Sequence, residues 1–321
     1  KSTYAMKFSY NLIKKFVPDL KNHEQLVNIL TTHVFEVESV VGDTIDIKVL
    51  PNRFSDAASH FGIAREVRAV LESKLGSFKV KLSKWIKAEG ALDLIVSVEE
   101  KSLCSRYVAR YFEISGIGAS PRWMQEVLKD CGMRSISAVV DIMNYVMLET
   151  GQPMHAFDAD KLKSIGVRRA RALEKIETLD GQSFELSNED LVIADGECAL
   201  AIAGIKGGKR AEVTKETRRI IVESANFDGV AIYKTSKKLK LSTDASMRFA
   251  HNLSPNLTAL GMERASQLLV EICGAKVGEV KDIYPKKQNL VAIKFSLAEF
   301  QKISGLVISA KEALAYLKRL D

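Results

Sequence analysis

A short sequence pattern near the start of the chain returns near its end. The stretch MKFS at residues 6–9 is followed by a helical pattern, and IKFS at residues 293–296 is followed by another. The sequence between them mixes strand and helix patterns without a fixed repeat. We therefore predict an α+β protein with a small α+β domain (residues 1–88), a large mixed α/β domain (89–286) and the start of a second small domain (287–321). A lone leading helix would leave its apolar face without a partner, so we expect a fragment of a longer protein.

The composition is that of a soluble globular protein. With 321 residues, 46% of them hydrophobic and 27% charged, the chain can bury a core and build two or three domains. No apolar run approaches the roughly 18 to 20 residues that cross a bilayer, and the N-terminal stretch lacks the apolar core of a signal peptide. We expect a cytoplasmic protein with no membrane partner.

Cysteine spacing and charge narrow the functional classes only slightly. The four cysteines, Cys104, Cys131, Cys198 and Cys273, lie tens of residues apart and form no CxxC pair. This spacing suggests neither a zinc site nor a disulfide framework. The formal charge of +7 and the pI near 9.0 are compatible with a polyanionic partner such as RNA, without establishing one.

Residues 137–158 are the most informative stretch of the chain. An apolar helical pattern carries Asn144 and ends at Gly151, and His155 follows four residues later. The two polar side chains are thus predicted to lie at the edge of an apolar surface. The alternative is that Asn144 and His155 merely satisfy local backbone groups.

Three further stretches carry weaker signals. Gly204 follows a short apolar strand, where a ligand can approach bare backbone amides, although taken alone the stretch is better explained as a plain tight turn. Glu223 ends another apolar strand, and such a carboxylate must be solvated, paired or used. The small residues Thr243 and Ala245 can shape a pocket or simply pack a helix.

The order of the motifs is similar to that of a known family. PNR at residues 51–53 and GIARE at 62–66 are followed by VVDIMNYVMLETGQPMHAFD, AIAGIKGG, VESANF and STDASMRF. Across essentially the whole chain, this series resembles the bacterial phenylalanyl-tRNA synthetase beta subunit, in its N-terminal part with the editing module. Two departures are visible: the tRNA-binding OB-fold insert common in the first unit is absent, and Met143 stands where relatives often have threonine.

The resemblance implies a site that hydrolyses tRNA(Phe) mischarged with tyrosine. It implies catalytic roles for His155, Asn144 and Thr243, and substrate-binding roles for Glu223, Gly204 and Ala245. Tyrosine differs from phenylalanine by one hydroxyl, and a buried acceptor such as Glu223 would favour the substrate that brings a donor. We expect no metal or cofactor for editing; ATP and Mg²⁺ would serve only the complete synthetase. Aminoacylation is not expected from this chain.

The implied partners are tRNA(Phe) and the synthetase alpha subunit, in an alpha2 beta2 assembly. Basic residues near the pocket segments are candidate phosphate contacts. They are Arg168, Arg169, Arg171, Lys206, Lys209, Arg210, Lys234, Lys237, Lys238 and Lys240. For any single one, a solvated basic surface is an equally good interpretation.

Two other functions remain open at this point. The chain could be a non-catalytic scaffold that holds tRNA and the alpha subunit while its editing pocket has decayed. It could also be a nucleic-acid-binding module that acts through the repeated small unit. A salt-dependent DNA affinity that is insensitive to changes around Glu223 would favour the module.

Overall fold

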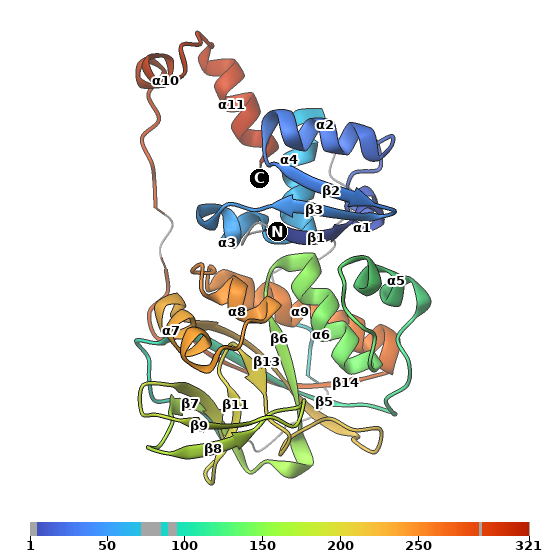
Figure 1. Cartoon of the computed structure of the whole chain (residues 1–321), viewed down its shortest axis with the longest axis vertical. Helices are drawn as coiled ribbons and strands as arrows, with labels where there is room; N and C mark the ends of the chain where they lie inside the picture. Colours follow the sequence, from blue (N-terminus) through green and yellow to red (C-terminus); the bar gives the residue numbers. More distant parts are fainter. Residues whose placement is uncertain (1–4, 72–84, 89–94, 289–290, 321) are drawn as a thin grey trace.

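The computed structural model describes residues 5–71, 85–88, 95–288 and 291–320. Helices and mostly antiparallel sheets alternate irregularly along these residues, which confirms the predicted α+β class; one strand pair, β4 with β7, is parallel (Figure 1). No helix in the described parts of the chain is long and apolar enough to cross a membrane.

The first unit is a three-stranded antiparallel sheet with helices packed on it. Its elements are β1 (Ala5–Ser9), α1 (Tyr10–Phe16), α2 (His23–His33), β2 (Val37–Val41), β3 (Thr44–Lys48), the 3-10 turn η1 (Pro51–Arg53), α3 (Phe54–Ala57) and α4 (His60–Leu71). The strand order is β1-β3-β2. Met6 and Phe8 alternate into the core from β1, as a half-buried strand requires. The Asn22 side chain caps α2 by accepting from the Gln25 amide at 2.9 Å.

The middle of the chain forms a layered domain around two sheets. Its first half contains β4 (Ile95–Val98), β5 (Cys104–Glu113), α5 (Arg122–Asp130), α6 (Ala138–Thr150), β6 (Met154–Asp158), the 3-10 turn η2 (Ala159–Lys161), β7 (Ser164–Arg169), β8 (Glu174–Glu177) and β9 (Ser183–Leu186). Its second half contains β10 (Leu191–Ala194), β11 (Ala199–Ile202), β12 (Lys206–Gly207), β13 (Arg219–Phe227), α7 (Gly229–Leu239), α8 (Asp244–Phe249), α9 (Asn256–Cys273) and β14 (Lys276–Ile283).

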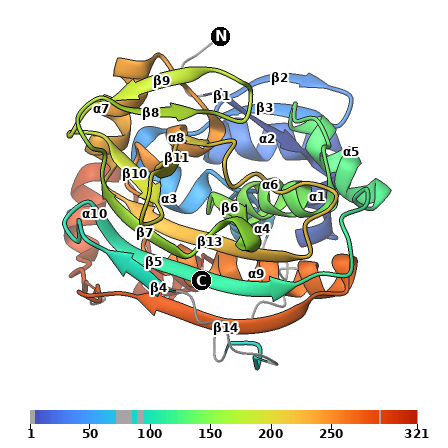
Figure 2. The ribbon, with the colours of Figure 1, turned by 90° about the horizontal axis from the view of Figure 1, so that it is seen from below.

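The four-stranded sheet, in the order β14-β5-β13-β6, separates two apolar cores. Ile220 and Val222 of β13 point to the core shared with α6 and α9. Ile221 and Ala225 point the other way, to the core shared with the five-stranded sheet β12-β11-β10-β7-β4. Strands of both sheets can be followed in Figure 2. Because side chains alternate along a strand, every second residue of β13 faces the space between the sheets. Glu223 is one of these residues.

The first core continues from the layered domain into the first unit. His60 of α4 links the two: its Nε2 atom accepts from the Ser9 amide at 2.8 Å, and its Nδ1 atom lies 2.7 Å from the Leu148 carbonyl oxygen of α6. The predicted domain boundaries near residues 88 and 286 therefore stay predictions, and residues 89–94 beside the first lie outside the described range.

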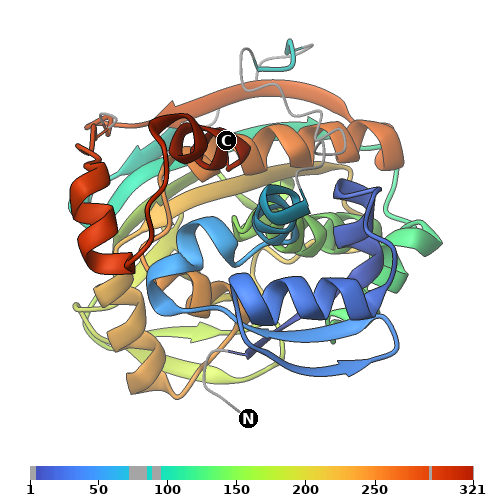
Figure 3. The same ribbon diagram turned by 90° about the horizontal axis from the view of Figure 1, so that it is seen from above.

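The C-terminal segment contains two helices, α10 (Leu297–Ser304) and α11 (Ala310–Arg319). The order of helices echoes α1 and α2, whereas residues 291–296 form no strand. The start of a second small domain at residues 287–321 stays a prediction. In the first unit β1 is paired with β3, and no described residue pairs in this way with 291–296. Helix α11 instead packs on α4, where the Arg68 guanidinium donates to the Arg319 carbonyl (Figure 3).

Candidate functional site

The pairing of β13 with β6 sets Glu223 directly opposite His155. Paired residues on neighbouring strands share a face, so both side chains point between the two sheets. A small recess of about 70 Å³ lies there, and it is lined by four of the six predicted pocket residues: His155, Gly204, Glu223 and Ala245. We call this space the inner recess.

Asn144 and Thr243, the other two predicted residues, line a wider cavity of about 450 Å³. His155 and Ala245 line both spaces, so the inner recess and the outer cavity are neighbours. The structure therefore places all six predicted residues on the walls of these two adjacent spaces, with Glu223 on the wall of the inner one. The Asn144 amide makes no hydrogen bond to any residue that the structure describes, which leaves it available to a ligand.

Glu223 is a buried carboxyl with one protein partner. Its side chain is 6% exposed, and the Tyr107 hydroxyl donates to its Oε2 atom at 3.2 Å. Burial raises the pKa of Glu223 to about 8, because the ionised form loses its hydration, and the Tyr107 hydrogen bond opposes this only in part. Near neutral pH the carboxyl is therefore largely protonated, and it can donate a hydrogen bond as well as accept one.

His155 is held by packing. Its ring meets Phe157 edge to face at a centroid distance of 4.6 Å, and it lies against the backbone of Gly207. A methyl group on Gly207 would come within 2.5 Å of the His155 Cε1 atom, so only glycine leaves room for the ring. Burial lowers the pKa of His155 to about 4, which keeps the imidazole neutral at physiological pH.

Thr243 and Gly204 shape the wall of the site. The Thr243 hydroxyl accepts from the Ser246 amide at 3.0 Å as the N-cap of α8, and it donates to the Ile205 carbonyl at 3.1 Å. Its single hydrogen is thus already used, and Thr243 can stabilise an oxyanion only by giving up this bond. Gly204 has a φ of +66°, and a side chain there would meet the Phe249 ring at 2.9 Å.

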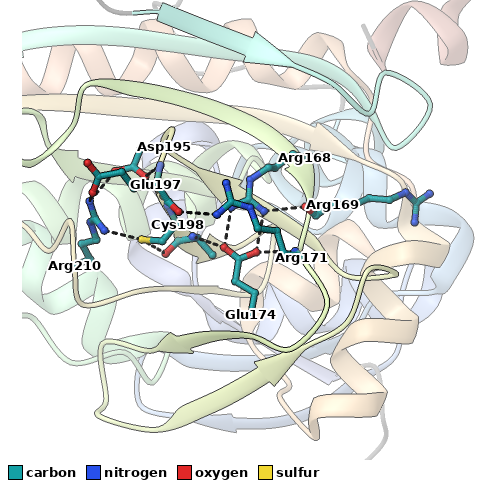
Figure 4. Close-up of polar contacts among 9 residues, drawn as sticks. Arg168, Arg169, Arg171, Glu174, Asp195, Glu197, Cys198 and Arg210 are labelled. Carbon is teal, nitrogen blue, oxygen red and sulfur yellow. Dashed lines mark hydrogen bonds and ion pairs between the residues drawn. The ribbon is translucent and has the colours of Figure 1, made fainter.

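Most of the predicted phosphate contacts are engaged within the chain. Arg168, 12% exposed, donates to both oxygens of Glu174 at 2.7 and 2.8 Å (Figure 4). This hydrogen bonding lowers the pKa of Glu174 to about 2. The other ion pairs join Arg169 to Glu100, Lys206 to Asp180, Lys209 to Glu177, Arg210 to Asp195 and Glu197, and Lys238 to Asp190.

The remaining basic side chains are more accessible. The Arg171 guanidinium donates to the Glu197 carbonyl at 3.0 Å, and the Lys237 ammonium lies over the Tyr233 ring. Lys234, Lys237 and Lys240 are exposed on or beside α7. These three lysines form no ion pair within the part of the chain that the structure describes, so they can meet a phosphate directly. Arg168 must first release the carboxylate of Glu174.

Two residues of the site were missed by sequence reasoning. Tyr107 comes from β5, more than a hundred residues before Glu223, and nothing local distinguishes it from other apolar-strand tyrosines. Gly207 was included only as part of the AIAGIKGG stretch. Its contact with His155 leaves no room for a side chain at this position. In the described ranges no three His, Cys, Asp or Glu side chains are grouped to hold a metal ion.

Comparisons with known proteins agree with the motif order. A family model described as the B3/4 domain matches residues 103–274. The chain is 40% identical over 295 residues to the phenylalanine--tRNA ligase beta subunit of Geobacter metallireducens, covering 90% of this chain and 36% of that protein. It is 41% identical over 289 residues to the beta subunit of Clostridium acetobutylicum, covering 89% and 36%.

The chain thus spans about a third of the length of these relatives. The resemblance to bacterial beta subunits that was stated from the motifs is confirmed. Among solved structures, the N-terminal fragment of the phenylalanyl-tRNA synthetase beta subunit from Pyrococcus horikoshii is 15% identical. That match has a TM-score of 0.49 and covers 98% of this chain and 89% of that one.

Proposed function

The chain belongs to the B3/4 domain family, and from this premise we propose that it is the N-terminal part of a phenylalanyl-tRNA synthetase beta subunit that edits mischarged tRNA. The reaction is hydrolysis of the ester between tyrosine and tRNA(Phe). The observation that carries the proposal is the convergence on one recess of Glu223 from β13, His155 from β6 and Gly204 from the turn between β11 and β12. In the complete enzyme, the partners are tRNA(Phe) and the alpha subunit, and the location is the cytoplasm.

Selection of tyrosine depends on the Glu223 carboxyl. A phenylalanyl group would leave one oxygen of this buried carboxyl without a partner, and an unpaired buried polar group costs about 1 to 3 kcal/mol. A tyrosyl group offers a hydroxyl that can either donate to or accept from that oxygen. The ring would lie against Gly204 and Ala245, which line the recess.

Hydrolysis requires a positioned water molecule and donors to the oxyanion. His155 is neutral and packed in place, so either ring nitrogen can orient water without first losing a proton. The Asn144 amide is the candidate donor from the outer cavity, and Thr243 holds the Gly204 loop through the Ile205 carbonyl. An aminoacyl ester is already reactive, so orientation, with help from the ribose hydroxyl of the substrate, suffices without a strong base.

The test is deacylation of tyrosyl-tRNA(Phe) and phenylalanyl-tRNA(Phe) by the wild type and by Glu223→Ala. We expect the wild type to hydrolyse the tyrosyl ester faster and the variant to lose most of this preference. Glu185→Ala on the exposed side of β9 is the matched control and should behave as the wild type.

Equal wild-type rates on the two esters would count against the role of Glu223. Loss of ester at the uncatalysed rate, both in this chain and in the assembled enzyme, would favour a scaffold that binds tRNA without editing it.

A further inference from the structure

The carboxyl that is proposed to recognise a phenol is itself held by a phenol of the protein. Tyr107 lies on β5 and Glu223 on β13, and the register of these strands places Tyr107 opposite Ala225, one diagonal step from Glu223. Both residues therefore face the space between the sheets. Tyr107 is completely buried, and its hydroxyl reaches the Glu223 Oε2 atom at 3.2 Å.

The two carboxyl oxygens of Glu223 are consequently unequal. Oε2 accepts from Tyr107, whereas Oε1 has no hydrogen-bond partner among the residues that the structure describes. Since Glu223 lines the inner recess, Oε1 is the oxygen left for a ligand. With Oε2 occupied as an acceptor, the proton of the neutral carboxyl belongs on Oε1.

We propose that Tyr107 is a positioning residue that sets substrate specificity by fixing the Glu223 carboxyl, so that Oε1 alone faces the tyrosine hydroxyl of the substrate. This inference rests on the proposed editing function and deepens it. When Glu223 is neutral, Oε1 donates to the substrate hydroxyl; when it is ionised, Oε1 accepts from it. A phenylalanyl ring can do neither, so the discrimination is present in both protonation states. It is stronger when Glu223 is ionised, because a hydrogen bond to a charged oxygen is stronger than one between neutral groups, and the kinetics therefore report the titration of Glu223.

The hydrogen bond from Tyr107 also limits the orientations that the Glu223 carboxyl can adopt. Without the Tyr107 hydroxyl, Oε2 would lose its donor, and the carboxyl could turn to place either oxygen in the recess. Burial raises the pKa of Tyr107, so the phenol stays protonated and keeps donating throughout the pH range in which proteins are stable. The hydrogen bond from Tyr107 lowers the pKa of Glu223, in opposition to burial.

The experiment compares Tyr107→Phe with wild type in deacylation of tyrosyl-tRNA(Phe) and phenylalanyl-tRNA(Phe) between pH 6 and 9. A single hydrogen bond corresponds to up to about a tenfold effect. We expect KM for the tyrosyl ester to rise by about that factor, with the phenylalanyl rate unchanged. The pH midpoint assigned to Glu223 should move upward, because its hydrogen-bond donor is gone.

The matched control is Tyr111→Phe on the same strand. Tyr111 donates to Glu113 at 3.3 Å and lines neither the inner recess nor the outer cavity, so its loss should change neither ester's kinetics nor the pH midpoint. A double variant, Tyr107→Phe with Glu223→Ala, should be no less selective than Glu223→Ala alone if Tyr107 acts through the carboxyl.

Equal losses on both esters, or an unmoved pH midpoint, would overturn the inference and leave Tyr107 with a structural role. If Tyr107→Phe does not fold, replacing Tyr107 by 3-fluorotyrosine supplies a stronger donor, and the midpoint should then move downward. A pH midpoint that does not move in the fluorotyrosine protein would also overturn the inference about Tyr107. A wild type without any deacylation would instead refute the proposed function, and the inference with it.

Discussion

Glutamine in place of Glu223 would remove the ionisable group while keeping an oxygen that can accept from Tyr107. In the folded chain burial raises the pKa of Glu223 to about 8, from an ordinary value of 4.5. Between these two values the unfolded chain has released the proton and the folded chain retains it. The wild-type free energy of unfolding therefore falls as pH rises, by about 1.4 kcal/mol per pH unit from this residue alone.

Glu223→Gln lacks this dependence, so its stability relative to wild type should increase from pH 4.5 to 8. Over about 3.5 pH units the relative gain amounts to roughly 5 kcal/mol. All other titrating groups, including His155, are common to both proteins and cancel in the difference. The pH dependence therefore isolates a single buried carboxyl.

The measurement is urea denaturation of both proteins at several pH values between 5 and 8. Glu185→Gln, at an exposed position of β9, controls for the loss of a negative charge and should parallel the wild type. A difference between Glu223→Gln and wild type that stays constant with pH would refute the reasoning, because it would mean that Glu223 ionises in the folded chain as it does in the unfolded one.

Two further predictions concern the walls and the basic surface of the site. Gly207→Ala should displace the His155 ring, since the new methyl group would lie 2.5 Å from it, and this should lower kcat for the tyrosyl ester at least tenfold. Gly118→Ala is the control, because a methyl group on Gly118 would have no other atom within 4 Å. Arg168→Ala should lower the free energy of unfolding by roughly 3 kcal/mol by leaving its carboxylate partner buried and unpaired. Lys237→Ala should instead weaken tRNA binding at low salt without changing stability, and denaturation together with salt-dependent binding distinguishes the two.

Local sequence patterns were sufficient to predict much of the framework. The apolar run before Glu223 lies in β13, and Gly151 ends α6 in a left-handed conformation with a φ of 87°. The expected strand end at Glu223 is wrong, because β13 continues to Phe227 and pairs on both sides with β5 and β6. The apolar run and the helix end depend on neighbours a few residues away, since periodicity and helix ends are local properties of the backbone. The α+β class and the separation of Asn144 on a helix from His155 on a strand follow from them.

The pattern at residues 293–296 shows where local reasoning fails. It matches residues 6–9 in sequence, yet only the first copy is a strand. A strand is stabilised by hydrogen bonds to a partner that is distant in the chain, and β1 has β3 as that partner. The same four-residue pattern can therefore be strand or coil, according to what the tertiary structure places beside it.

What the sequence determined by itself was which polar residue types, among them Glu223 and His155, lie close to apolar stretches of the chain. Only the tertiary structure decided that strand register sets these two side chains face to face, that Tyr107 occupies one carboxyl oxygen, and that Arg168 is held by Glu174. Register and charge pairing join segments tens to more than a hundred residues apart. A local pattern can supply the groups, but only packing in three dimensions decides which of them meet.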